Sequence, residues 1–207
     1  MDAKTQPQKS AYHHGDLRTA LLDEAATMLK EGGEAGLSMR KLAANVDVSR
    51  TAAYHYFSDK QGLLCAIAEE GFAKFMAATN TREETQGDTV SEDTIYTFAK
   101  NYVDFATNNP EYYDLMFGGT LWKSKTLTES LQKAAHQSFR QYVTRVSHWR
   151  KLGLISKDVD PLRYAQVSWG TLHGISRLTI DGIYIDRKAL DAMCRNMAHI
   201  FYQQLEI

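Results

Sequence analysis

The chain has 207 residues, 43% of them hydrophobic, and carries a formal net charge of −1. This length allows one large domain or a small domain joined to a medium one, and the hydrophobic content excludes an intrinsically disordered chain. No apolar run approaches the ~18 residues that span a bilayer, and the polar N-terminus lacks the apolar segment of a secretory signal, so a cytoplasmic protein is expected.

The N-terminal part is predicted to hold an arm followed by helices. Residues 1–15 are polar and are expected to form a flexible arm, and apolar residues at helical spacing begin at Asp16. After a pair of glycines, two short helices are predicted over 38–46 and 49–57, each opened by a serine that can cap it. Asp47 falls in the turn between them, where a left-handed residue is expected and Asp tolerates that conformation.

The remainder of the chain is predicted to form longer helices. A helix over 59–80 precedes a polar stretch, residues 80–91, which is the best candidate for a joint. Further helices are expected over 96–108, 110–117, 126–151, 161–181 and 186–207. Because no strand pattern and no internal repeat is found, the predicted fold class is all-α.

The two short helices have the layout of a helix-turn-helix, whose second helix lies in the DNA major groove. Their apolar residues would fix the angle between them. Outward side chains that can meet base edges or phosphates are Ser49, Arg50, Thr51 and His55. The segment 38–60 has four basic residues and two aspartates, a local balance of +2 that is modest for a DNA-binding surface.

At this point the chain resembles the TetR family of bacterial transcription regulators. The match runs over residues 12–72 and includes LSMRKLAANVDVSRTAAYHYF, and the family spacing of Tyr, Phe, Lys and Leu is met by Tyr54, Phe57, Lys60 and Leu63. The resemblance implies an N-terminal DNA-binding unit, a helical ligand-binding C-terminal domain and a homodimer. The expected division is an arm at 1–15, a DNA-binding domain at 16–60, and a ligand-binding and dimerisation domain at 61–207.

The resemblance also implies DNA contacts, residue by residue. Side chains expected to approach bases are those of Arg40, Arg50, Thr51 and His55. Side chains expected to contact or position phosphates are those of Ser38, Tyr54, Tyr56 and Lys60. The alternatives are that Ser38 is only a helix cap, that Tyr54 is a half-buried wall of the motif and that Lys60 is a solvated charge. The chain departs from many relatives at Asp47, where they have Gly, and at Tyr56, where they have His.

The second half carries aromatic and polar residues suited to a ligand cavity. The candidates are Tyr102, Phe105, Tyr113, Met116, Phe117, Trp122, Trp169, His173 and Arg177. Ordinary core packing is the alternative at each of them. His173 and Arg177 lie one helical turn apart. They could bind an acidic ligand, or they could find their hydrogen-bond partners across a dimer interface. The interface is the favoured alternative.

Features of the last two helices point to a homodimer formed through them. Gly170 and Gly174 permit close approach of two helices. Trp169, His173 and Gly174 resemble the signature of a Trp-His-Gly (WHG) subfamily of the same family.

No catalytic motif is found: GxSxG, P-loop and Rossmann glycine patterns are absent from the sequence, and the histidines lack HxxxH or HExxH spacing. No catalytic residue, metal or cofactor is therefore expected. The prediction is a sequence-specific repressor that binds a pseudo-palindromic double-stranded DNA operator and is released by a small apolar or aromatic effector, without contact to a membrane. An activator, or a helical interaction module without DNA binding, are the alternatives.

Overall fold

The computed structural model describes residues 14–80, 91–124, 126–184 and 186–202 of the chain, and nearly all of the predicted arm lies outside them. The chain forms two compact units, residues 1–63 and 64–207. Within the described residues every regular element is helical, which confirms the all-α prediction. In those same residues no helix is both long enough and apolar enough to cross a membrane.

The first unit contains α1 (His14–Gly36), α2 (Met39–Asn45), α3 (Arg50–Tyr56) and the start of α4 (Lys60–Thr79). The helical path of α1 breaks at Gly33, whose φ of 60° an L residue rarely adopts, as the paired glycines predicted. Asp47 has a φ of 54°, so the predicted left-handed turn residue is also confirmed.

Each of the short helices begins at the serine that the sequence indicated. The Ser38 hydroxyl accepts a hydrogen bond from Lys41 N at 3.2 Å, and the Ser49 hydroxyl accepts one from Ala52 N at 3.1 Å. Each bond satisfies one of the backbone donors that the first turn of a helix leaves without a partner.

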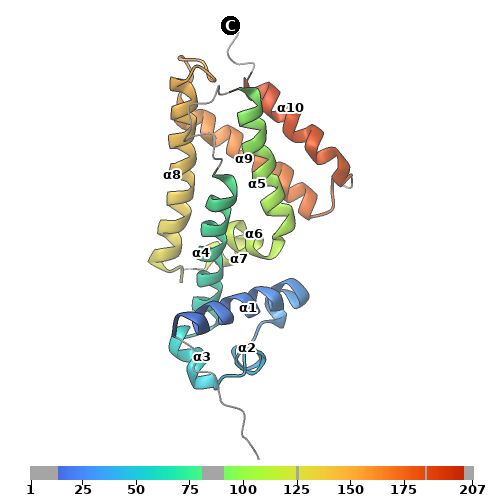
Figure 1. Ribbon diagram of the computed structural model, residues 1–207. Coiled ribbons are helices and arrows are strands. Elements are labelled where there is room, and N and C mark those ends of the chain that lie inside the picture. The colour runs from blue at the N-terminus through green and yellow to red at the C-terminus, as the bar shows by residue number, and fades with distance from the viewer. Residues whose placement is uncertain (1–13, 81–90, 125, 185, 203–207) are drawn as a thin grey trace, which may run out of the picture. The chain divides into compact units, whose positions relative to one another are not determined.

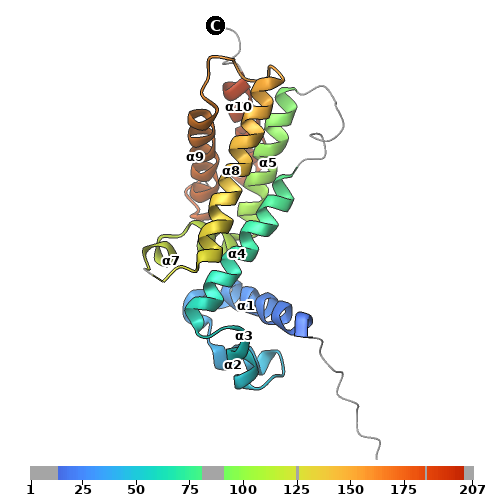
Figure 2. The same cartoon turned by 90° about the vertical axis from the view of Figure 1, so that its left-hand side faces the viewer.

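The second unit continues α4 and adds α5 (Glu92–Asn108), α6 (Pro110–Phe117), α7 (Gly119–Lys123), α8 (Glu129–Lys151), α9 (Pro161–Ile180) and α10 (Leu190–Tyr202). Helix α5 packs against both α9 and α10, and α8 packs against α9 (Figure 1). Within this unit α8 lies alongside α5 and the C-terminal part of α4 (Figure 2).

An aromatic core joins these helices. Phe98 of α5 stacks on Tyr142 of α8 with ring centroids 4.6 Å apart, and Phe75 of α4 meets Trp169 of α9 edge to face at 5.5 Å. Trp149 is almost completely buried beside Phe98. Offset and edge-to-face rings bring large apolar area together in favourable geometry, which holds α4, α5, α8 and α9 in register.

Some boundaries differ from the prediction for local reasons. Helix α8 begins at Glu129 rather than 126, because the Thr128 hydroxyl caps it by accepting from Leu131 N. The last helix is preceded by the 3-10 turn η2 (Arg187–Ala189). The five-residue helix α7 was not predicted, since it is too short to show an apolar period.

Candidate functional site

Helix α3 presents one polar face and buries the opposite one. Ala53 is fully buried and packs α3 onto its unit, whereas Arg50, Thr51, Tyr54 and His55 are exposed. These four lie at positions i, i+1, i+4 and i+5, so they share one side of the helix. The exposed side therefore offers guanidinium, hydroxyl and imidazole groups, which are the groups that proteins use to contact bases and phosphates.

Backbone hydrogen bonds close the turn between α2 and α3. Val48 N donates to Ala43 O at 2.9 Å and Val46 N donates to Leu42 O at 3.1 Å, which closes the turn around Asp47. At the other end of α3, Phe57 is buried and Arg18 of α1 lies over its ring, 5.7 Å from the centroid. The polar face is thus carried by a helix that is fixed at both ends.

The remaining DNA-contact candidates occupy different surroundings in the first unit. Arg40 is exposed on α2, and Tyr56 is half-buried at the end of α3. The Lys60 ammonium donates to the backbone carbonyl of Glu34, near the end of α1. An ammonium has three donors, so this bond leaves donors that can meet a phosphate. The Ser38 hydroxyl acts as a cap acceptor and keeps its own proton as a donor.

In the second unit, four of the residues predicted to bind a ligand come together around one cavity, named here the apolar pocket. Its volume is about 320 Å³, and it is lined by Phe72, Met116, Phe117, Trp122, Ala135, Phe139 and Trp169. Three of the lining residues, Phe72, Ala135 and Phe139, were not predicted from the sequence. The spacing of the last two, one turn apart on α8, was the available signal, but such spacing is shared by ordinary core residues.

Three further candidates form a hydrogen-bonded chain beside this pocket. The Tyr102 and Tyr113 hydroxyls are 3.2 Å apart, and the Tyr113 hydroxyl is 2.7 Å from Nδ1 of His173. Burial raises the pKa of Tyr113 to about 12, so this phenol keeps its proton. Burial, and then the charge of Arg177, lower the pKa of His173 below its usual 6.5. A neutral His173 can therefore accept a hydrogen bond at Nδ1 from the Tyr113 hydroxyl.

The last two ligand candidates are engaged elsewhere. The Arg177 guanidinium forms ion pairs with Asp114 and with Asp181, the latter at 2.6 Å. Phe105 packs its ring on Phe75 with centroids 5.4 Å apart. Neither residue lines the apolar pocket. Because two carboxylates already neutralise Arg177, the structure gives no support to this residue as the anchor of an acidic ligand.

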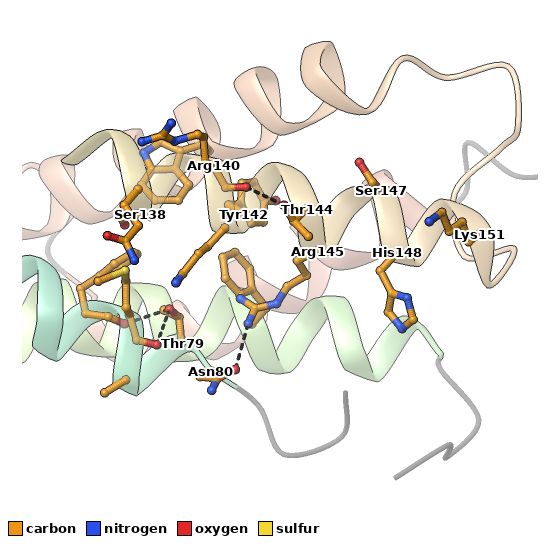
Figure 3. Close-up of a pocket in the computed structure, with 17 residues that line it drawn as sticks. Thr79, Asn80, Ser138, Arg140, Tyr142, Thr144, Arg145, Ser147, His148 and Lys151 are labelled. Carbon is orange, nitrogen blue, oxygen red and sulfur yellow. Dashed lines mark hydrogen bonds between the residues drawn. The ribbon is translucent and has the colours of Figure 1, made fainter. Parts of the chain in front are cut away.

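A second and larger cavity, named here the cationic groove, runs between α4 and α8 (Figure 3). Its volume is about 800 Å³, and its apolar wall includes Phe75, Phe98 and Trp169. Its basic lining consists of Arg140, Arg145, His148 and Lys151, all from α8. These four residues were not predicted from the sequence to form a site. The signal was a charge bias, since α8 has five Lys and Arg residues against one Glu.

Comparison with known proteins gives two family matches that cover separate parts of the chain. Residues 21–67 match the bacterial regulatory proteins of the tetR family, and residues 95–200 match the tetracyclin repressor-like C-terminal domain. The second match alone covers half of the chain.

Curated relatives are named as transcription regulators. The HTH-type transcriptional repressor AcnR of Corynebacterium glutamicum is 25% identical over 187 residues, which cover 88% of this chain and 87% of that protein. The HTH-type transcriptional regulator Rv1816 of Mycobacterium tuberculosis is 26% identical over 103 residues, 49% of this chain and 44% of that protein. The alignment thus spans less than half the length of the latter relative.

Solved structures share the same architecture. A protein with unknown function from Rhodococcus sp. RHA1 superposes with a TM-score of 0.81 and 31% identity over 96% of this chain and 100% of that one. The TetR family transcriptional regulator PfmR from Thermus thermophilus superposes with a TM-score of 0.65 and 19% identity, over 90% of this chain and 99% of that one. The second likeness concerns the fold alone.

Proposed function

The chain belongs to the TetR family of bacterial transcription regulators, and from this premise we propose that it is a homodimeric repressor whose hold on its operator is released by a small apolar or aromatic effector. Residues 16–60 form the DNA-binding domain, and residues 61–207 bind the effector and the second copy. The WHG resemblance at Trp169, His173 and Gly174 belongs to the same proposal.

The main support for sequence-specific DNA binding is the exposed polar face of α3, a helix that is positioned by the Ser49 cap and the turn at Asp47. Arg50, Thr51 and His55 meet base edges, and Lys60 meets a phosphate. The test is a gel shift with genomic fragments across a range of salt concentrations, because phosphate contacts make affinity salt-dependent. Absence of retardation at low salt refutes the proposal and favours an interaction module.

Variants separate the two kinds of contact. Lys60→Ala weakens binding to all sequences and flattens the salt slope by about one unit, whereas Arg50 or Thr51 substitutions change base preference by roughly 1–3 kcal/mol per lost contact. A change of base preference in Lys60→Ala would show that the motif docks differently.

The surface that supports a homodimer lies on α9 and α10. Val167 is 63% exposed and Ile200 is 61% exposed, which is unusual for residues of their size and polarity. Gly170 and Gly174 follow Val167 on α9, and a Cβ added at either would meet nothing within 4 Å. An apolar surface with two glycines lets a second helix approach closely. A two-fold dimer would present two α3 helices to half-sites about 34–36 Å apart.

Support for an apolar or aromatic effector comes from the apolar pocket, where five aromatic side chains and Met116 line the cavity. The effector stabilises a form of the protein that fits the operator poorly, so effector and DNA weaken each other by the same factor. The test starts from a compound that raises the melting temperature of the protein. Its affinity is then measured with and without operator, and equal values rule out this mechanism.

A further inference from the structure

A chain of hydrogen bonds leads from the core of the second unit to His173. Tyr102 is fully buried, and its hydroxyl lies 3.2 Å from the Tyr113 hydroxyl. The Tyr113 hydroxyl lies 2.7 Å from Nδ1 of His173 on α9. Among the described residues, the Tyr102 hydroxyl has no hydrogen-bond partner other than Tyr113. The arrangement of protons in this chain is therefore set from its buried end.

The direction of the two bonds follows from the position of Tyr102. A phenol proton that is buried without an acceptor costs free energy, so Tyr102 donates to the Tyr113 oxygen. The Tyr113 hydroxyl then donates to Nδ1 of His173, at the shorter of the two distances. The Ser176 hydroxyl beside Tyr113 can donate to the same phenol oxygen without changing this order. Because Nδ1 is an acceptor, a neutral His173 carries its proton on Nε2.

The Nε2 proton of His173 is directed away from the two tyrosines. The nitrogens of an imidazole ring point in nearly opposite directions, so Nε2 faces away from the phenol that Nδ1 contacts. The side chain is half-buried, and no described residue accepts a hydrogen bond from Nε2. A donor that is held in one orientation and has no acceptor in the described chain is suited to fix the orientation of a ligand.

The apolar pocket lies beside this donor. Phe117 lines the pocket, and its ring centroid is 5.3 Å from that of His173. Trp169 also lines the pocket and precedes His173 by one turn of α9. Both aromatic side chains are half-buried, so part of each ring is open to a ligand. An apolar body that lies against Phe117 therefore has its edge close to the His173 ring.

The charges near His173 give no attraction for an anion. Arg177 lies one turn further along α9 and forms ion pairs with Asp114 and Asp181. This group has one more negative than positive charge, and a neutral His173 adds none. A neutral ligand with a hydrogen-bond acceptor matches these surroundings better than a carboxylate or phosphate does.

We propose that the effector is a neutral molecule that accepts a hydrogen bond from Nε2 of His173 through a carbonyl oxygen, while its apolar body lies in the apolar pocket against Phe117 and Trp169. This inference rests on the proposed function, in which an effector binds the second unit. It names the polar group that an otherwise apolar effector carries. Tyr102 and Tyr113 are positioning residues, because they act through His173 and not on the ligand.

The proton of His173 is located first, in the full chain without ligand or DNA. Nitrogen NMR of isotope-labelled protein distinguishes a protonated Nε2 from a protonated Nδ1, and His173→Gln identifies the signal by its loss. The Nε2–H form is expected at a pH above the usual imidazole pKa of about 6.5. Tyr113→Phe removes the hydroxyl that donates to Nδ1 and is expected to increase the share of the Nδ1–H form. Tyr102→Phe keeps that hydroxyl and is the matched control.

Three probes on one ring system then test the acceptor: methyl naphthyl ketone, isopropenylnaphthalene and naphthoate, each substituted at the same ring position. The ketone and the isopropenyl group have nearly the same shape, but only the ketone accepts a hydrogen bond. Affinities for the full chain are measured by calorimetry without DNA. The ketone is expected to bind about fivefold more tightly than its isopropenyl analogue, as one neutral hydrogen bond provides, and more tightly than naphthoate.

Variants place the acceptor at His173. His173→Phe keeps an aromatic ring without the donor, so the ketone should bind no better than the isopropenyl analogue, whose own affinity should stay unchanged. His173→Gln supplies an amide N–H in place of Nε2 and is expected to keep part of the difference. His136→Phe on the exposed face of α8 is expected to change nothing. If His173→Phe does not fold, Tyr113→Phe serves in its place, because it frees Nδ1 and should reduce the difference.

Three results overturn the inference: a neutral His173 with its proton on Nδ1, a ketone that binds no better than its isopropenyl analogue, or a difference that survives His173→Phe. Each of these results leaves operator retardation by the chain intact, so it does not touch the proposed repressor function. Loss of retardation for the unmodified chain would refute the proposed function while the NMR and binding data on His173 still stand.

Discussion

Two buried serines of the second unit lead to opposite predictions for the same substitution. Ser138 and Ser168 are 3% and 0% exposed, and both lie inside helices. The Ser168 hydroxyl is 2.8 Å from the hydroxyl of buried Tyr142 and donates to Tyr164 O at 2.7 Å. The Ser138 hydroxyl has no hydrogen-bond partner among the described residues. Substitution by alanine therefore removes a hydrogen-bonded hydroxyl at Ser168 and a hydroxyl without a hydrogen-bond partner among the described residues at Ser138.

The free energies follow from what each variant leaves behind. Ser168→Ala leaves the Tyr142 hydroxyl buried without a partner, which costs about 1–3 kcal/mol. Alanine also gains roughly 0.5 kcal/mol of helix propensity over serine, so the net loss is about 0.5–2.5 kcal/mol. Ser138→Ala gains the same propensity and removes a buried polar group, so it is expected to stabilise the chain. The two variants should therefore differ in unfolding free energy by at least about 1 kcal/mol.

Urea denaturation followed by far-ultraviolet circular dichroism measures this difference. All samples are compared at one protein concentration, because dimer formation would add a concentration-dependent contribution. The propensity gain is common to both variants and cancels between them. If Ser138→Ala destabilises as much as Ser168→Ala, the buried Ser138 hydroxyl has a partner in solution and the reasoning fails.

Four further predictions concern the two units separately. Asp47→Ala should lower the unfolding free energy by about 1 kcal/mol in urea titrations and Asp47→Gly should not, because Asp tolerates positive φ better than Ala does and glycine adopts it without penalty. Ser49→Ala should lose about 1 kcal/mol with its cap and weaken operator retardation, whereas Ser49→Asp should restore stability. Because the pKa of His173 is lowered, unfolding free energy should fall as pH drops below 6.5, and His173→Gln should reduce that slope. Ile200→Asp should convert dimer to monomer in sedimentation experiments, whereas Gln132→Asp on exposed α8 should not.

The sign of the His173 prediction follows from proton linkage. The unfolded state takes up the proton at a pH where the folded state does not, so acid favours unfolding across the interval from 6.5 down to the lowered pKa of the folded state. His136→Gln on the exposed face of α8 is the matched control. An unchanged slope in His173→Gln would show that this imidazole is not held neutral by its surroundings.

The motif of the first unit was predictable because its signals are local. Ser38 and Ser49 cap helices within three residues of themselves, and Asp47 adopts the left-handed conformation that its place between two helices required. Exposure of the α3 face follows from the helical period once Ala53 is taken as buried. The all-α fold was likewise predictable from apolar periodicity. No contact between distant residues was needed for these predictions.

The cavities of the second unit could not be predicted in the same way. Whether an aromatic residue lines a pocket or fills a core depends on which helices pack together, and the period of one helix does not contain that information. Trp122 and Phe105 looked alike in the sequence, but only Trp122 reaches the apolar pocket. Arg177 was a ligand candidate for which the dimer interface was favoured, and its contact with Asp114, which is 63 residues away in the chain, could not be predicted from the helical period.

The net charge of the chain was a weak guide to function, because a total does not show where the charged side chains lie. The chain sums to −1, yet α8 alone has four more Lys and Arg than acidic residues, from five basic residues and Glu129. Coulomb interactions between exposed charges fall off within about 10 Å at moderate salt, so a charged ligand responds to the side chains near it rather than to the total. Charge therefore has to be assessed helix by helix and then against the packing.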